Sequence, residues 1–202
     1  MKNNTLDIYN LNASKYVSRY EQSTPQPLIK NLQTFFTGSE KLLEIGCGSG
    51  NTANKMAKSG FNVLATDGSK YMIMEAKSYH NSSGLEFKEC ILPSVSEGKF
   101  DGVYSIATLM HLDYRDVKES IDNISNILNS NGKFYLSVSL DRGDVNSSGF
   151  DEDGRFFLVL VKDMWKLFLH DSGFEIQEII YNSDDSLGRT NITWCDFMCV
   201  KK

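Results

Sequence analysis

Apolar residues spaced three or four positions apart mark the first part of the chain. They predict a helix over residues 3–20, whose apolar face is formed by Leu6, Tyr9, Ala13, Tyr16, Val17 and Tyr20. Pro25 and Pro27 interrupt this pattern, and a second helix is predicted over residues 28–36. Two helices are therefore expected before the first strand.

From residue 41 onward, short apolar strands alternate with amphipathic helices. The predicted strands cover residues 41–45, 62–66, 85–88, 102–106, 133–140, 174–181 and 194–200. The predicted helices cover residues 51–59, 70–79, 116–128 and 162–171. Asn131-Gly132 and Ser172-Gly173 are expected to end the last two of these helices.

This alternation predicts an α/β fold with a mainly parallel sheet, because parallel strands need helical crossovers. The last two predicted strands have no helix between them, so they are expected to form an antiparallel hairpin at the sheet edge. No linker tract or repeat divides the chain, and we expect a single domain over residues 1–202.

Composition narrows the possible classes of protein. The chain has 202 residues and a net charge of −5, which disfavours broad nucleic-acid binding. Its four cysteines contain no CxxC pair, so neither a zinc site nor a disulfide framework is expected, and no metal is predicted. The longest apolar run has six residues, at 156–161, and the N-terminus lacks an apolar signal core. We expect a soluble, cytoplasmic protein without membrane association.

A glycine-rich turn is the most informative stretch. The sequence LLEIGCGSG at residues 42–50 predicts a buried strand, a turn at Gly46 and Gly48, and a helix that begins after Gly50. The spacing is G-x-G-x-G, whereas a dinucleotide site needs a glycine at position 51, which is Asn51. NAD is therefore disfavoured.

Two acids accompany this turn. Glu44 could hold a ligand's ammonium group, which adenosylmethionine has and a pyrophosphate lacks. Asp67 ends the second predicted strand, where an acid can accept hydrogen bonds from both ribose hydroxyls. The alternative is a tight turn with a helix-capping aspartate. The combination of Glu44, three glycines and Asp67 favours a cofactor site.

At this point nearly the whole chain resembles the class I S-adenosylmethionine-dependent methyltransferases (EC 2.1.1.-). The similar segments are LEIGCGSG at 43–50, VLATDGS at 63–69, FDGVYSIATLMH at 100–111 and ILNSNGKFYLS at 127–137. GRFF at 154–157, LGR at 187–189 and Trp194 are similar to a small bacterial subgroup related to tellurite-resistance enzymes. The resemblance implies a three-layer α/β/α sandwich with a Rossmann-like core over residues 38–202 and an N-terminal helical lid over residues 1–37.

The resemblance also implies which residues bind the cofactor. The implied set is Glu44, Gly46, Cys47, Gly48, Gly50, Asp67, Gly68, Ser69, Met72, Cys90, Ile91, Ile106 and Ala107. In the family the amino acid end of the ligand lies over the glycine turn and the ribose lies on the acid after the second strand. Family members often place an acid near the adenine after the third strand. Here that run is Glu89-Cys90-Ile91, so backbone amides could take its place.

Several methyltransferase chemistries are disfavoured. The chain has no Pro-Pro pair, as amino-methylating DNA enzymes need, and no Pro-Cys pair, as cytosine-C5 enzymes need. Cys195 and Cys199 have no third cysteine nearby to hold an iron–sulfur cluster, and buried thiols are the simpler interpretation. In-line methyl transfer to an O, N or S nucleophile remains, and alignment alone can supply much of its rate.

Candidate catalytic and acceptor residues follow the fourth strand or lie in loops. His111 is the candidate general base, with a structural histidine as the alternative. Arg155 and Arg189 could clamp an acidic group of the acceptor, or Arg155 could pair with the acidic residues 151–153. Tyr16, with Tyr9 and Tyr20, could close over the ligands as a lid or pack the helix. His80 and His170 read as helix caps.

The sequence therefore predicts methyl transfer from S-adenosylmethionine, which leaves S-adenosylhomocysteine, to a small-molecule acceptor. A tRNA or protein methyltransferase is one alternative, although the net charge disfavours nucleic acid. A non-catalytic module that binds S-adenosylmethionine is the other. The sequence does not identify the acceptor or the oligomeric state.

Overall fold

A computed structural model describes residues 4–22, 26–182 and 191–202. Its helices are α1 (Thr5–Leu11), α2 (Ala13–Glu21), α3 (Gln26–Phe35), α4 (Asn51–Lys58), α5 (Lys70–Tyr79), η1 (Leu109–His111, a 3-10 turn), α6 (Tyr114–Ile127) and α7 (Lys162–Asp171). Its strands are β1 (Lys41–Ile45), β2 (Asn62–Asp67), β3 (Leu85–Glu89), β4 (Phe100–Ile106), β5 (Leu128–Arg142), β6 (Phe174–Asn182) and β7 (Ile192–Lys201).

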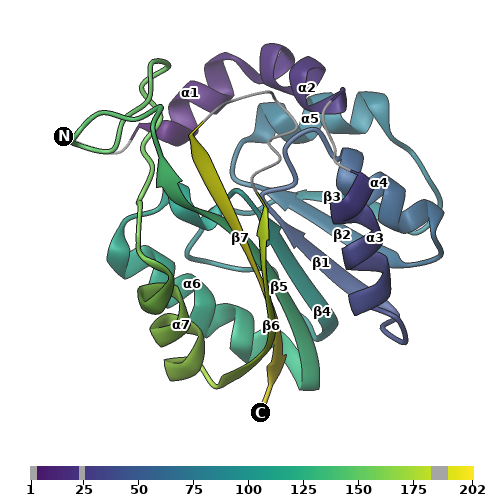
Figure 1. Cartoon of the computed structure of the whole chain (residues 1–202). Coiled ribbons are helices and arrows are strands. Elements are labelled where there is room, and N and C mark those ends of the chain that lie inside the picture. Colours follow the sequence, from purple (N-terminus) through teal and green to yellow (C-terminus); the bar gives the residue numbers. More distant parts are fainter. Residues whose placement is uncertain (1–3, 23–25, 183–190) are drawn as a thin grey trace.

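The strands form one sheet in the order β3-β2-β1-β4-β5-β7-β6 (Figure 1). The first five strands are parallel, whereas β7 runs antiparallel to both β5 and β6. This topology confirms the predicted Rossmann-like sheet and its antiparallel C-terminal hairpin. The last strand in the sequence therefore lies inside the sheet, between β5 and β6.

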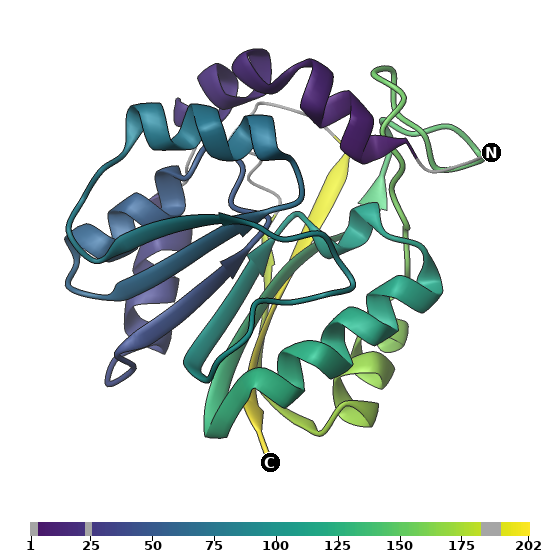
Figure 2. The same cartoon turned by 180° about the vertical axis from the view of Figure 1, so that it is seen from behind.

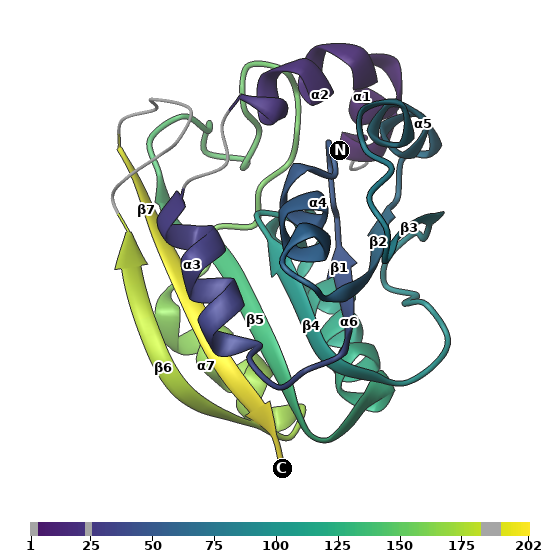
Figure 3. The same ribbon diagram turned by 90° about the vertical axis from the view of Figure 1, so that its right-hand side faces the viewer.

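Helices cover both faces of the sheet (Figures 2 and 3). On one face, α6 and α7 contribute Val117, Ile121 and Trp165 to the larger core. On the other face, Leu32 of α3, Phe36 just after it and Met56 of α4 belong to a second core. Burial of these two apolar faces supplies the main stabilisation of the three layers.

Helices α1 and α2 lie across the carboxyl ends of the parallel strands, next to α5 (Figure 3). We call α1 and α2 the lid. Tyr16 and Val17 of α2 are fully buried against Met72 of α5, in a small core of their own. Helix α3, by contrast, belongs to the layer that covers the sheet.

The predicted single helix over residues 3–20 is wrong, because the structure divides it at Asn12. The Asn12 backbone has φ −122°, and its side-chain amide donates a hydrogen bond to the Ile8 carbonyl at 2.9 Å. Such local side-chain bonds compete with helix continuation. The apolar spacing does not reveal the break, since both halves place apolar residues toward the protein.

Two boundaries around α6 also differ from the prediction. The helix begins at Tyr114 because the Asp113 side chain accepts a hydrogen bond from the Asp116 amide at 2.9 Å, as an N-cap does. Strand β5 begins at Leu128, which pairs with Phe100, and so it includes the predicted Asn131-Gly132 turn. The register between β4 and β5 shifts between Phe100 and Gly102, and Asn131, which lies opposite this shift, has φ +60°.

Candidate functional site

A cavity of about 520 Å³ opens at the carboxyl ends of the parallel strands, beneath the lid. Its size is within the range of small-molecule sites, and its place is the usual one for ligands of open α/β sheets. Its wall contains the glycine turn, the ends of β2 and β4, and side chains from α1, α2, η1 and β7. It therefore brings together segments from both ends of the sequence.

The glycine turn follows β1, and its backbone excludes side chains. Gly46 has φ +72°, and a Cβ there would lie 2.0 Å from the Thr108 hydroxyl oxygen. Gly48 has φ +57° and lies next to the cavity, and a Cβ added there would meet nothing nearer than the Tyr20 ring at 3.5 Å. Both positions therefore need glycine, one for close packing and the other for backbone conformation.

Asp67 holds this turn from the end of β2. One carboxylate oxygen accepts the Gly48 amide at 3.0 Å, and the other accepts the Ser69 amide at 2.9 Å. Burial raises the pKa of Asp67 to about 6, although both amides act in the opposite direction. Each oxygen retains a further lone pair, with which the carboxylate could accept ligand hydroxyls.

Glu44 is the second acid that lines the cavity, and the residue is only 3% exposed to solvent. The Tyr104 hydroxyl donates to its carboxylate at 3.3 Å. Burial, assisted by the charge of nearby Asp67, raises the pKa of Glu44 to about 8. A cationic group bound beside Glu44 would favour its ionised form.

These two acids define the ligand that the site can hold. The cavity is largely apolar, and Glu44 and Asp67 line it together with Gly46 and Gly48 of the turn. A ligand with an ammonium group and neighbouring sugar hydroxyls matches this arrangement. S-adenosylmethionine has both groups, so the residues present fit this cofactor.

The remaining predicted cofactor residues divide into two groups. The cavity wall includes Cys47, Gly68, Met72, Cys90, Ile91, Ile106 and Ala107, with Ala107 at φ +55°. Gly50 and Ser69 do not belong to this wall. Gly50 packs under the Phe87 ring, and Ser69 caps α5 by accepting the Met72 amide and donating to Asn10 of the lid. Both residues pack or bond to elements next to the cavity wall without lining it.

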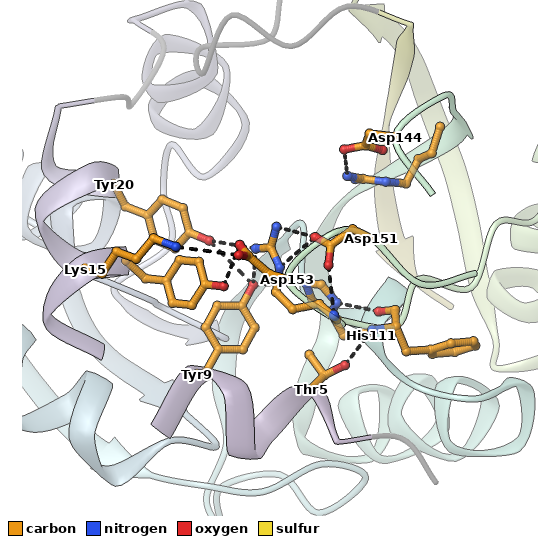
Figure 4. A network of polar contacts seen from close by, with 12 residues as sticks. Thr5, Tyr9, Lys15, Tyr20, His111, Asp144, Asp151 and Asp153 are labelled. Atoms are coloured by element: carbon orange, nitrogen blue, oxygen red, sulfur yellow. Dashed lines mark hydrogen bonds and ion pairs between the residues drawn. The ribbon is translucent and has the colours of Figure 1, made fainter. Parts of the chain in front are cut away.

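His111 lies at the end of η1 and lines the cavity. Its Nδ1 is 2.7 Å from the Phe156 carbonyl oxygen, and its Nε2 is 3.2 Å from the Tyr9 hydroxyl (Figure 4). Because a carbonyl can only accept, Nδ1 carries the hydrogen. In the neutral ring, Nε2 is therefore the basic nitrogen, and it faces the lid.

Arg155 lines the cavity, but its guanidinium is already engaged. Asp151 accepts from Nε at 2.9 Å and from Nη2 at 2.6 Å, and both side chains are less than one-tenth exposed. The Nη1 atom donates to the hydroxyl oxygens of Tyr9 and Tyr20 at 3.2 and 3.3 Å (Figure 4). The sequence offered two tasks for Arg155, which were to clamp an acidic group of the acceptor or to pair with the acidic residues 151–153. The structure shows the pairing, and the paired side chains are buried.

The other predicted acceptor residues lie elsewhere. Tyr16 is fully buried outside the cavity wall, and its hydroxyl donates to Asp153 at 3.0 Å, so it packs and tethers the lid. Arg189 lies outside the described residues. His80 is not a simple cap: it contacts Glu21 at 2.9 Å and joins α5 to the lid. His170 is exposed beside Asp171.

Several wall residues were not predicted from the sequence. Leu6, Thr108, Asp113, Asp116 and Asp196 line the cavity. Thr108 lies in the segment 100–111 that resembles the family, and Leu6 lies on the predicted apolar helix face that also carries Tyr9, but neither was singled out as a site residue. The three aspartates belong to no motif that the sequence analysis identified. Asp196 is buried and accepts the Tyr135 hydroxyl at 2.7 Å, a pairing between strands that spacing does not reveal.

Membrane-spanning helices and metal clusters are both absent from the described part of the chain. No helix within residues 4–22, 26–182 and 191–202 has the length and apolarity needed to cross a membrane. Over the same ranges, no three histidine, cysteine, aspartate or glutamate residues are grouped to hold a metal ion. Cys195 and Cys199 are both fully buried, as plain core thiols are.

Comparison with known sequences points to one family. The profile described as "Methyltransferase domain" matches residues 43–136. The chain is 24% identical over 152 residues to O-methyltransferase resE of Aspergillus sclerotiorum, with 71% of this chain and 54% of that protein covered. It is 27% identical over 116 residues to the ubiquinone biosynthesis O-methyltransferase of Rickettsia felis, with 55% and 47% covered. The chain thus spans about half the length of these two relatives.

Solved structures share the fold across almost the whole chain. The [4+2]-cyclase SpnF superimposes with a TM-score of 0.78 at 13% identity, covering 96% of this chain and 94% of SpnF. Magnesium protoporphyrin IX methyltransferase (ChlM) from Synechocystis PCC 6803, solved with bound S-adenosylhomocysteine, gives 0.73 at 16% identity, covering 97% of each chain.

The profile match begins within β1 and ends within β5, so it spans the glycine turn, Asp67 and His111. The similarity to tellurite-resistance enzymes stays a prediction. Residues 43–136 thus match a methyltransferase domain, and this match, the methyltransferase relatives and the shared fold support the class I S-adenosylmethionine-dependent methyltransferase family, in which S-adenosylmethionine is the methyl donor.

Proposed function

We propose that the protein transfers a methyl group from S-adenosylmethionine to a hydroxyl oxygen of a small molecule. The observation that carries this proposal is that one cavity is lined by two buried acids, Glu44 and Asp67, which could hold an ammonium group and a ribose, and by His111 with its basic ring nitrogen. The names of the curated relatives, which are O-methyltransferases, favour oxygen as the acceptor atom.

In this proposal each residue has a defined task. Glu44 holds the ammonium group, Asp67 holds the ribose, and Gly48 lets the ligand approach the backbone. When bound, S-adenosylmethionine supplies an activated methyl group whose bond to sulfur breaks with the electron pair left on sulfur. His111 receives the proton of the acceptor hydroxyl, and the lid excludes water from the cavity.

The charges of the cavity favour a neutral acceptor. Among the described wall residues, Arg155 is the one guanidinium or ammonium, and Asp151 already neutralises it. The same wall contains Glu44, Asp67, Asp113, Asp116 and Asp196. An acceptor with a phosphate or carboxylate would meet net negative charge there, which also disfavours tRNA.

A different function on the same fold is the main alternative. SpnF is named as a cyclase although it shares this architecture, and fold alone does not decide activity. A module that binds the cofactor without turnover is the other alternative. Cofactor binding and turnover must therefore be measured separately.

Calorimetric titration with S-adenosylmethionine, S-adenosylhomocysteine and NAD is the first experiment. Micromolar binding of the first two ligands without binding of NAD is expected. Turnover is then followed as S-adenosylhomocysteine release with simple phenols and catechols, using benzoate and aniline as matched probes. Binding with no turnover of any probe would contradict the enzymatic proposal. No binding would contradict the cofactor site itself.

Replacing His111 tests the assigned base. His111→Gln should lower turnover of a hydroxyl probe by about 10²–10⁴-fold, the usual contribution of a general base. Affinity for S-adenosylhomocysteine should stay within about twofold, because His111 has no task in holding the cofactor. Equal turnover would assign His111 to structure alone.

A further inference from the structure

The basic nitrogen of His111 faces a side chain of the lid. Nε2 is 3.2 Å from the Tyr9 hydroxyl, and Tyr9 lies on α1, more than one hundred residues earlier in the chain. The two rings meet edge to face, with centroids 5.6 Å apart. With the lid in this position, an acceptor hydroxyl that approaches Nε2 meets the Tyr9 oxygen.

The direction of this contact follows from its neighbours. Arg155 can only donate, and its Nη1 lies 3.2 Å from the Tyr9 oxygen, which therefore accepts. The Nδ1 hydrogen of His111 is committed to the Phe156 carbonyl, so Nε2 of the neutral ring also accepts. The Tyr9 hydroxyl hydrogen is thus the one that lies between oxygen and Nε2, and the chain of bonds runs from Arg155 through Tyr9 to His111.

The surroundings hold Tyr9 in this position. Thr5, one turn earlier on α1, accepts the Phe156 amide through its hydroxyl at 2.8 Å, so the loop that binds Nδ1 also binds the lid (Figure 4). Asp151 holds Arg155 from behind through two hydrogen bonds. The second acceptor position of the Tyr9 oxygen has a long contact, 3.5 Å, with the Tyr20 hydroxyl. A stronger donor could take that position.

We propose that Tyr9 belongs to the acceptor site and relays the proton of the acceptor hydroxyl to His111. This inference rests on the proposed function. The acceptor oxygen keeps the electron pair of its O–H bond for the new bond to carbon, and its proton goes to the Tyr9 oxygen. The original Tyr9 hydrogen moves to Nε2, which leaves a neutral phenol and an imidazolium. Tyr9 would then be a catalytic residue that the lid supplies.

The first test needs no acceptor. Nitrogen-15 NMR of the histidine rings is recorded on the whole chain with S-adenosylhomocysteine, for the wild type, Tyr9→Phe and Tyr16→Phe. We expect Nδ1 of His111 to be protonated, and its Nε2 to move toward the position of a nitrogen without a donor in Tyr9→Phe only. Tyr16→Phe is the matched control, since it removes a lid hydroxyl bonded to Asp153 outside the cavity wall. A His111 Nε2 that carries the hydrogen, or a chemical shift of Nε2 that is the same in Tyr9→Phe and in the wild type, would overturn the inference.

The second test is turnover of the hydroxyl probe that the wild type methylates best. Tyr9→Phe should lower kcat at least tenfold and flatten the acidic limb of the pH profile, while KM for S-adenosylmethionine stays within about twofold. Tyr9→Phe combined with His111→Gln should be no slower than His111→Gln alone, because the two act in one relay. Full activity of Tyr9→Phe would mean that the acceptor reaches Nε2 directly, and would reject the relay. Failure of the wild type on every hydroxyl probe would instead reject the proposed function.

Discussion

Asp67 has a structural task as well as its proposed binding task, since its carboxylate fastens the Gly48 amide and the Ser69 amide. The sequence offered ribose binding and helix capping as alternatives. In the structure Asp67 both holds the backbone and lines the cavity. A substitution here therefore changes the shape of the turn together with the hydrogen bonds to a ligand.

We expect Asp67→Ala to weaken S-adenosylmethionine binding at least tenfold, because the ribose loses its acceptors and Gly48 loses its partner. Isothermal titration measures this effect. Asp101→Ala is the matched control: Asp101 also accepts two backbone amides, from Glu40 and Lys41, but at the opposite end of the sheet. Equal affinities of wild type and Asp67→Ala would contradict the assigned site.

Glu44 should make cofactor binding depend on pH. Burial raises its pKa to about 8, so the ligand-free protein holds it neutral near pH 7, and an ammonium ligand must first ionise it. Affinity for S-adenosylhomocysteine should therefore rise between pH 6 and about pH 8.5, and Glu44→Gln should bind weakly with a flatter profile. Calorimetric titration of the wild type and of Glu44→Gln with S-adenosylhomocysteine at four pH values measures both profiles.

The same shift acts on stability with the opposite sign. In the unfolded chain Glu44 has its ordinary pKa of 4.5, whereas in the ligand-free folded protein its pKa is about 8. Between these two pH values the folded protein therefore binds more protons than the unfolded chain does. The free energy of unfolding should therefore fall as the pH rises through this window. A wild-type profile no steeper than that of Glu44→Gln would contradict the burial effect.

At the residue level, the sequence placed residues at the cavity best where one local motif fixes their positions. Glu44, Gly46 and Gly48 belong to one strand–turn–helix unit and all line the cavity, and Asp67 joins them from the end of β2. Tyr16 and Arg155 were harder, since their surroundings depend on contacts between segments far apart in sequence. Tyr16 meets Asp153 across 137 residues, and no local spacing encodes that pairing.

At the scale of the elements, α4 depends on a glycine that does not line the cavity. Gly50 precedes the helix with φ +80°, and an added Cβ would lie 2.7 Å from the Phe87 ring of β3. The third glycine of the motif therefore serves helix–sheet packing. This is a structural requirement that accompanies the binding turn.

Gly50→Ala should lower the free energy of unfolding more than Gly38→Ala does. Gly38 has a similar φ of +84° but open space around it, so both variants share the cost of the left-handed backbone and only Gly50→Ala adds the clash. We expect a difference of about 1–3 kcal/mol in urea unfolding, typical of overpacking. Equal losses would mean that Phe87 moves aside easily.

Elements with strong apolar periodicity were predicted closely. The boundaries of β1, α5 and α7 agree with the sequence prediction, because their apolar residues meet the sheet or its core at regular spacing. The break at Asn12 and the early start of β5 were not predicted. Both depend on a local hydrogen bond or a distant strand partner, which leave the apolar pattern unchanged.

At the scale of the whole molecule, the cavity joins the lid, the sheet and the loop at residues 144–157. A ligand held by all of these parts should stabilise the folded protein as a unit. S-adenosylhomocysteine at about 100 times its Kd should add about 2.7 kcal/mol, which corresponds to a rise in Tm of roughly 5–10 °C. Thermal unfolding with and without ligand measures it, NAD serves as the control, and an unchanged Tm would contradict specific binding.

The position of β7 has a consequence for biosynthesis. Strand β6 leaves the ribosome before β7, yet its neighbour in the finished sheet is β7 and not β5. Until β7 has been translated, β6 lacks its native neighbour, and the edge of β5 that β7 later covers is unpaired. The nascent protein therefore completes its sheet only when this ten-residue strand has emerged and has entered between two strands made earlier.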